Sequence, residues 1–162
     1  MNCCLTSKPC LNGGTCFPLF LPDRKRFKCK CPHEYEGGRC EKKRCDPGYT
    51  GENCLHPISS CKGYKNGNRV NGYYTVLDDA LKAYQVYCYF EKLGTGTRAW
   101  TLIQSYSFMN RENFSKALFQ NTPVNEDSPS WEEYRLSHSR MIRAFNDSRV
   151  KWSITCNCNT EG

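Results

Sequence analysis

The chain has 162 residues, which allows one ordinary domain or two small ones, and 13 of these residues are cysteines. Its residues are 38% hydrophobic and 13% aromatic, and its net charge is +7, a composition that excludes a large apolar core and a disordered chain. The best apolar run, residues 17–22, contains two prolines and is too short to cross a bilayer. Because cysteines at this density need an oxidising compartment, the composition predicts a soluble extracellular protein that is held together by disulfides.

The N-terminus begins Met1-Asn2-Cys3-Cys4 and lacks the charged and apolar segments of a signal peptide. A disulfide-rich protein needs such a signal to reach its compartment, so we expect this sequence to be a fragment of a longer secreted chain. The number of cysteines is odd, so at least one of them is a free thiol, pairs between chains or had its partner in a missing segment.

The spacing of the cysteines divides the chain, because ten of the 13 lie in the first 61 residues. Residues 1–54 are rich in Gly, Pro, Lys and Cys and show no helical period, which predicts loops and short hairpins. Residues 55–60 have the composition of a linker. From residue 61 to residue 162, aromatic and β-branched runs alternate with helical patches, which predicts a small α+β domain. We expect strands in this domain at 72–76, 84–90, 99–104 and 150–156. We expect helices at 113–119 and 131–145.

Six of the seven cysteines in the first 41 residues, those from Cys4 to Cys40, are separated by 5, 5, 12, 1 and 8 residues. The segments 9–16 and 27–31 lie within this pattern. This pattern resembles the EGF-like module, a small disulfide-rich β fold, and places it at residues 1–41. Six cysteines allow fifteen pairings, and spacing alone does not choose among them. A zinc site is disfavoured because none of the three histidines lies near a Cys-x-x-Cys pair. The order of the family implies three bridges: Cys4–Cys16, Cys10–Cys29 and Cys31–Cys40.

Residues 45–54 repeat the end of the same module, so residues 42–54 resemble a truncated second EGF-like unit with a Cys45–Cys54 bridge. We expect this unit to act as a rigid spacer. Many EGF-like modules bind calcium, but no acidic residue precedes the first cysteine here and Asp23 is one place out of register. We therefore expect no metal site and no cofactor.

Residues 61–104 resemble the start of a fibrinogen C-terminal-like domain through Cys61 and the segments 71–75, 86–88 and 100–104. The resemblance implies a Cys61–Cys88 bridge, with Trp100 packed over the bridged strands. It ends near residue 105, before the part of that family that holds its calcium loop and ligand pocket, so lectin-like recognition is not implied.

The tail at 131–137 and 151–156 resembles secreted cnidarian proteins with the same half-domain, a group that includes coral skeletal organic matrix proteins. Three cysteines have no implied partner in either module, and Cys156 and Cys158 are too close in sequence to bridge each other without strain. Two arrangements remain open. One is an intrachain bridge between the N-terminal module and the tail, and the other is an interchain bond through Cys3, Cys156 or Cys158.

Four residues are candidates for glycosylation. Asn113 and Asn146 each begin an Asn-x-Ser sequon without proline in the middle. Thr15 and Thr50 lie where EGF-like modules carry O-linked sugars, although both also fit plain turn positions.

Positive charge is concentrated on the N-terminal module, in residues 24–30 and 42–44. These residues either attract sulfated polysaccharide or acidic matrix, or they are a solvated hairpin tip. Nucleic acid is excluded as a partner by the compartment. Acidic residues number only 16, which disfavours direct binding to calcium mineral.

Catalysis has little support, because His33, His56 and His138 are scattered and no nucleophile or phosphate-binding motif is present. The sequence therefore predicts a secreted, non-enzymatic protein for adhesion or assembly in extracellular matrix, where it binds a matrix protein or polysaccharide and belongs to the organic matrix of a mineralised skeleton. The sequence also predicts an aromatic face formed by Tyr73, Tyr74, Tyr87 and Tyr89, which is part of the core, a partner-binding surface or both. The rival hypotheses are a soluble sugar-recognising or receptor-binding defence protein and an ectodomain fragment of a membrane-anchored adhesion receptor.

Overall fold

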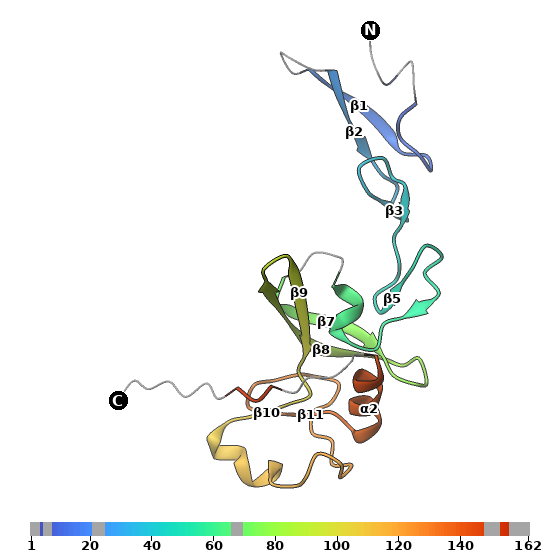
Figure 1. Ribbon diagram of the computed structural model, residues 1–162. Helices are drawn as coiled ribbons and strands as arrows, with labels where there is room; N and C mark the ends of the chain where they lie inside the picture. The colour runs from blue at the N-terminus through green and yellow to red at the C-terminus, as the bar shows by residue number, and fades with distance from the viewer. Residues whose placement is uncertain (1–3, 5–7, 21–24, 66–69, 148–152, 156–162) are drawn as a thin grey trace.

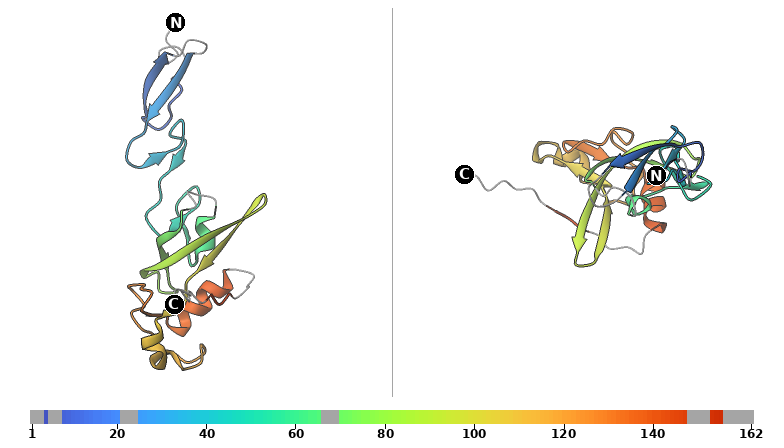
Figure 2. Two further views of the ribbon diagram at one scale, coloured as in Figure 1. Left: turned by 90° about the vertical axis from the view of Figure 1, so that its left-hand side faces the viewer. Right: turned by 90° about the horizontal axis from the view of Figure 1, so that it is seen from above.

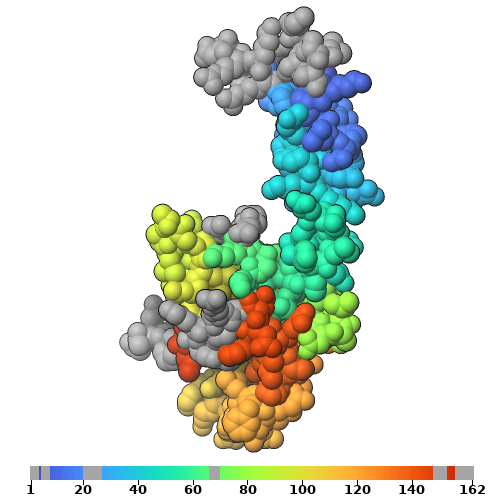
Figure 3. Space-filling model, turned by 45° about the vertical axis from the view of Figure 1, so that its right-hand side comes forward, coloured from blue at the N-terminus to red at the C-terminus, as the bar shows by residue number. Residues whose placement is uncertain are grey.

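The computed structural model describes residues 4, 8–20, 25–65, 70–147 and 153–155. A narrow N-terminal stalk stands on a wider C-terminal body, as Figures 1 and 2 show from three directions. The space-filling view in Figure 3 shows the same outline, with residues 45–60 at the junction. The small fraction of apolar residues explains the narrow stalk, because there is too little apolar surface in this part of the chain to build a globular core.

The stalk begins with two hairpins that are held by disulfides. Strand β1 (Thr15–Phe20) pairs antiparallel with β2 (Lys25–Lys30), and β3 (Tyr35–Glu36) pairs with β4 (Lys42–Lys43). Gly14 is required where the chain crosses the Cys31–Cys40 bridge, since a Cβ atom there would lie 2.6 Å from the sulfur of Cys40. The bridges in this part are Cys4–Cys16, Cys10–Cys29 and Cys31–Cys40, the pairs that the resemblance implies.

Residues 45–60 join the stalk to the body. Strand β5 (Tyr49–Thr50) pairs with β6 (His56–Pro57), and a disulfide connects Cys45 with Cys54. The segment 55–60 is not the open linker that its composition suggests, because residues 58–60 are buried and the Ile58 carbonyl accepts a hydrogen bond from the Leu77 N–H at 2.7 Å.

The body is built on a three-stranded antiparallel sheet in the order β7 (Gly72–Leu77), β8 (Ala83–Leu93) and β9 (Gly96–Thr101). The first two correspond to the strands predicted at 72–76 and 84–90, whereas the strand predicted at 99–104 matches β9 only over 99–101 and continues into residues 102 and 103, which are not in a strand. Their residues alternate, so that Tyr84, Val86, Cys88 and Phe90 of β8 are buried while their neighbours point outward. The 3-10 helix η1 (Cys61–Tyr64) lies beside the sheet, and the Cys61–Cys88 bridge ties the two together.

The core of the body joins the inner face of this sheet to the last elements of the chain. Its buried members are Ile58, Cys61, Val76, Tyr84, Val86, Cys88, Phe90, Tyr134, Leu136 and Met141. Trp100 is not among them. It is partly exposed and lies opposite Tyr89, on the face of the sheet away from Cys88, so the predicted packing of Trp100 over the bridge is wrong.

The second half of the body contains less helix than the sequence pattern suggests. Strand β10 (Gln104–Tyr106) pairs with β11 (Glu133–Arg135), a 3-10 helix η2 spans Phe108–Phe114, and the helix α2 spans His138–Asn146. The helix predicted at 113–119 is therefore wrong, and the one predicted at 131–145 is correct only in its second part. The strand predicted at 150–156 falls mostly outside the described residues.

The body is thus an assembly of small β-sheets with few helices, and a regular α+β domain is not confirmed. Among the described residues, no helix is long and apolar enough to span a membrane.

Candidate interaction surface

The outer face of the sheet β7–β8–β9 carries a cluster of aromatic side chains. Tyr73 lies opposite Tyr87 across the strand pair, with ring centroids 5.4 Å apart in an edge-to-face arrangement. Trp131 packs against the other side of Tyr87 at 5.0 Å. Tyr73, Tyr89 and Trp131 are 52%, 48% and 56% exposed, so about half of each side chain remains in contact with water. We call Tyr73, Tyr87, Tyr89 and Trp131 the aromatic face.

Tyr74, the fourth tyrosine predicted for this face, has a different position. It points to the inner side of the sheet, where its ring lies 4.7 Å from that of Tyr64 and 5.6 Å from that of Phe90. The alternation of a β-strand requires this, because neighbouring residues 73 and 74 must face opposite sides. Trp131 takes its place on the aromatic face. No signal in the sequence places Trp131 there, since it lies 44 positions after Tyr87 in an irregular segment.

A polar rim borders the aromatic face on β8 and β9. The Glu91 carboxylate accepts a hydrogen bond from the indole N–H of Trp100 at 3.1 Å and lies 3.4 Å from Nη1 of Arg98. The Arg98 guanidinium stacks 5.5 Å from the centroid of the Trp100 ring. An aromatic centre with a charged border has the composition of a protein-binding patch.

A buried arginine supports the sheet from its inner side. The Arg140 side chain is 4% exposed, stacks 4.0 Å from the centroid of Tyr84 and lies 2.7 Å from the carboxylate of Asp127. This hydrogen bond lowers the pKa of Asp127, and burial raises the pKa of Tyr84 to about 12. Asp78 and Glu126 complete the charge pairing of Arg140 at 3.5 Å and 3.4 Å. These contacts join α2 to two loops, so we interpret the cluster as structural.

The predicted glycosylation residues are all exposed. Asn113 lies near the end of η2, with its amide 3.5 Å from the Glu133 carboxylate, and Asn146 ends α2. Ser148, which completes the second sequon, is outside the described residues. Thr15 begins β1 and Thr50 lies in β5. All four positions are accessible to modifying enzymes, which leaves their modification a prediction.

The basic residues of the stalk lie on two different hairpins. Lys28 and Lys30 are exposed on β2, and residues 42–44 are exposed on and after β4, where Arg44 lies 3.8 Å from Glu36. Arg24 and Asp23 are outside the described residues. The run is therefore divided between two surfaces, and its role in binding stays a prediction.

The remaining candidate residues do not form a site. His33, His56 and His138 lie in separate parts of the fold, in the stalk, in β6 and at the start of α2. Within the part of the chain that the structure describes, no three His, Cys, Asp or Glu residues are grouped so that they could hold a metal ion. Cys3, Cys156 and Cys158 lie outside the described residues, so their pairing stays open.

Comparison with known proteins agrees with the disulfide frame of the stalk. A family model described as the EGF-like domain matches residues 4–39. Residues 4–39 are therefore an EGF-like domain, as the spacing of the cysteines predicts. The match ends before the body, so the likeness of residues 61–104 to a fibrinogen-like unit stays a prediction.

Three curated relatives share this region. The chain is 49% identical to protein jagged-1 of Homo sapiens over 41 residues, which is 25% of this chain and 3% of that protein. It is 38% identical to multiple epidermal growth factor-like domains protein 6 of Rattus norvegicus over 58 residues, or 36% of this chain and 3% of the relative. It is 47% identical to netrin-G2 of Homo sapiens over 38 residues, or 24% of this chain and 6% of the relative. The chain thus spans only a small part of the relatives that it matches, and no solved structure matches it.

Proposed function

We propose that this chain is a secreted, non-enzymatic protein for adhesion or assembly in the extracellular matrix, where its aromatic face binds a matrix protein. Within the described residues, ten cysteines form five disulfides, and such a number persists only in an oxidising compartment. The EGF-like domain forms a stalk that extends from the body (Figure 1). An extracellular spacer with an exposed binding face is the arrangement that adhesion requires.

The aromatic face is the observation that carries this proposal. Tyrosine and tryptophan dominate the energetic centres of protein interfaces, because they bury much area at a small cost in side-chain entropy. Tyr73, Tyr87 and Trp131 already hold one another in place through edge-to-face contacts, so a partner would meet a preorganised surface. The face lies on the outer side of a sheet, where three of its four side chains are about half exposed, which favours a protein over a small molecule.

The finer parts of the proposal depend on sequence resemblance. The segments 71–75, 86–88 and 100–104 support a relationship of the body to the front half of a fibrinogen-like domain. The tail at 131–137 supports membership of the organic matrix of a mineralised skeleton. Exposed sequons at Asn113 and Asn146 support a glycoprotein. In this proposal the protein contacts the organic part of such a matrix and not the mineral, since acidic stretches are absent from its sequence.

A retention assay tests the function. The secreted full chain is incubated with decellularised matrix at physiological salt, and the bound fraction is compared for wild type and for the triple variant Tyr73→Ser, Tyr89→Ser and Trp131→Ser. Loss of two or three hot-spot side chains is expected to reduce affinity by about tenfold to a hundredfold. The matched control is Phe108→Ser, Met109→Ser and Phe119→Ser, which removes three apolar side chains that are even more exposed and lie elsewhere on the body.

The control variant should be retained like the wild type. Equal retention of all three proteins would contradict the role of the aromatic face. A wild-type chain that is not retained at all would contradict the matrix function itself.

A further inference from the structure

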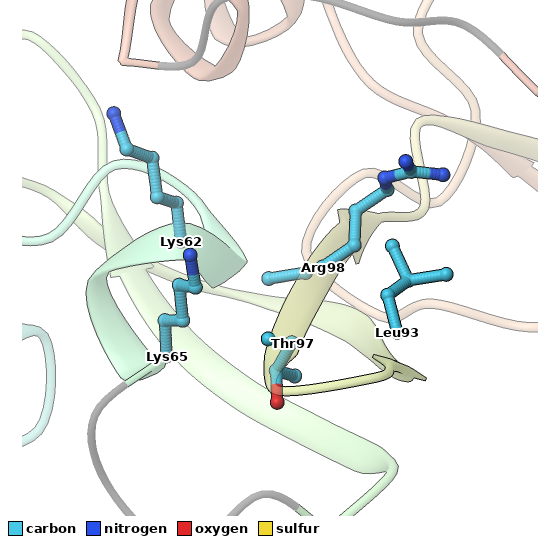
Figure 4. Close-up of a pocket in the computed structure, with 7 residues that line it drawn as sticks. Lys62, Lys65, Leu93, Thr97 and Arg98 are labelled. Carbon is cyan, nitrogen blue, oxygen red and sulfur yellow. The ribbon is translucent and has the colours of Figure 1, made fainter.

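A second surface of the body has a different chemistry from the aromatic face. A shallow cleft of about 460 Å³ lies between η1 and the edge strand β9. Figure 4 shows Lys62 and Lys65 rising from η1 on one side and Arg98 extending from β9 on the other. Leu93, Gly96 and Ala99 add apolar surface to the lining. The cleft therefore combines three cations with an apolar patch.

The charges of the cleft are positioned by the fold. Lys62 donates to the main-chain carbonyl of Asp147 at 2.5 Å, at the C-terminal end of α2, which orients its ammonium group. Arg98 is held at the rim by Glu91 and by stacking on Trp100. None of the residues that line the cleft is acidic, and Glu91 pairs with Arg98 from outside the lining. The cleft thus concentrates positive potential in one concave surface.

We propose that this cleft binds the sulfate groups of a sulfated polysaccharide. A sulfate ester presents three oxygen acceptors on a tetrahedral group, and donors that approach from both sides of the cleft can meet several of them at once. A carboxylate offers only two oxygens in one plane. The volume admits about one sugar residue, whose apolar ring face can lie on the apolar part of the lining.

This proposal adds a class of ligand to the proposed matrix function. It rests on that function only for the extracellular location of the protein. The cleft borders the aromatic face, since Arg98 also belongs to the polar rim of that face, but it shares no residue with the aromatic face itself. None of its three cations is in the basic run of the stalk. Two surfaces of one small body would then bind two components of a matrix, a protein and a polysaccharide. Such a pair of sites would strengthen attachment by effective concentration, without any further contact.

Binding of the secreted full chain to heparin at physiological salt tests the proposal, with fully desulfated heparin and poly-glutamate as comparison probes. The variant Lys62→Gln, Lys65→Gln and Arg98→Gln is expected to bind heparin about tenfold more weakly, as the loss of three solvent-exposed charge contacts predicts. The control Lys42→Gln, Lys43→Gln and Arg44→Gln removes the same number of charges from the basic run of the stalk, which is the rival site for the same ligand. The control should lose less than about twofold, because a screened distant charge contributes little.

Equal losses of heparin binding in the two triple variants, or a loss in the stalk variant alone, would overturn the proposal. So would binding of desulfated heparin as strong as that of heparin. Binding of poly-glutamate that is as strong as that of heparin and is weakened as much by the glutamine variant of the cleft would also overturn it. The variant Lys62→Arg and Lys65→Arg keeps the charges and should keep the affinity, which separates charge from folding. If the glutamine triple variant is unstable, Lys65→Gln alone should still weaken binding by about twofold. The variant Tyr73→Ser and Trp131→Ser, which keeps Tyr89 opposite Trp100 and so leaves the stacking of Arg98 unchanged, should bind heparin normally, so the two proposals fail independently.

Discussion

Tyr84 and Tyr134 have buried phenol groups, and neither hydroxyl has a hydrogen-bond partner among the described residues. Burial raises the pKa of Tyr84 to about 12 and raises the pKa of Tyr134 further. A folded-state pKa above the unfolded value of 10.0 favours the neutral phenol in the folded protein. The contribution of each tyrosine to stability is therefore complete below pH 10 and is lost as the pH rises through the folded pKa.

The change Tyr84→Phe removes one of these two groups. We expect the free energy of unfolding at pH 7 to change by less than about 1 kcal/mol, because no hydrogen bond is lost. Between pH 10 and 12, the free energy of unfolding should decline with pH less steeply than in wild type. The difference in slope is about 1.4 kcal/mol per pH unit, which is the value for one proton. Denaturant titrations at several pH values measure both quantities. Tyr73→Phe, which alters a half-exposed ring, should leave the slope unchanged, and an unchanged slope for Tyr84→Phe would contradict the prediction.

At the scale of elements, one buried arginine holds an irregular segment in place. The Arg135 side chain on β11 is fully buried and donates to the carbonyls of Lys116, Ala117 and Gln120 at 2.9, 2.6 and 3.2 Å. These bonds substitute for the main-chain pairing that the predicted helix at 113–119 would have provided. The segment after η2 is therefore ordered by tertiary contacts and not by its own helical propensity.

The change Arg135→Met should release this segment, because three carbonyl groups lose their donor at once. We expect amide exchange across 115–121 to accelerate by at least about tenfold and cleavage by trypsin after Lys116 to become faster, while protection of β7–β9 changes little. Hydrogen exchange with peptide mapping measures this. Arg111→Gln, which removes an exposed arginine bonded to the Phe108 carbonyl, is the control and should leave exchange at 115–121 as in wild type.

The link between η1 and β8 depends on the Cys61–Cys88 bridge, whose sequence separation of 27 is the largest among the described disulfides. Replacing both cysteines by serine should lower the stability of the body by about 3–4 kcal/mol, mainly through the entropy of the longer unfolded loop. Thermal unfolding followed by near-ultraviolet circular dichroism measures the loss. The Cys45–Cys54 disulfide closes a loop with a separation of only 9, so replacing these two cysteines should lower the stability less, by about 2–3 kcal/mol. A larger loss in the second variant would contradict the ranking.

The strands at 72–76 and 84–90 could be predicted from the sequence because each is a run of aromatic and β-branched residues, which is a strong local signal for a strand. The helix at 131–145 could be predicted only in part. Met141, Ile142 and Phe145 have helical spacing and lie in α2, but residues 133–135 pair with β10 instead, a long-range contact that no local pattern encodes. The same limit applies to the aromatic face, where Tyr73 and Tyr87 were predictable and Trp131 was not.

At the scale of the whole molecule, the elongated shape in Figure 1 depends on how the stalk meets the body. The Gly48 N–H donates to the hydroxyl of Tyr64 at 3.2 Å, and its carbonyl accepts from the Ile58 N–H at 2.7 Å. A Cβ atom on Gly48 would lie 3.1 Å from the buried side chain of Leu77. The segment 45–60 is thus docked on the sheet, which gives the expected spacer a physical basis for its stiffness.

The change Gly48→Val should loosen this junction without unfolding either part. Gly48 has a φ of +91°, which L-residues rarely adopt, and the added side chain would collide with Leu77. We expect small-angle X-ray scattering of the full chain to show a broader distribution of end-to-end distances, while the disulfides and the unfolding of the body remain. Gly38→Val is the matched control, because no atom lies within 4 Å of the position of its Cβ. A Gly48→Val profile that superimposes on that of the wild type would mean that the junction is not what makes the molecule stiff.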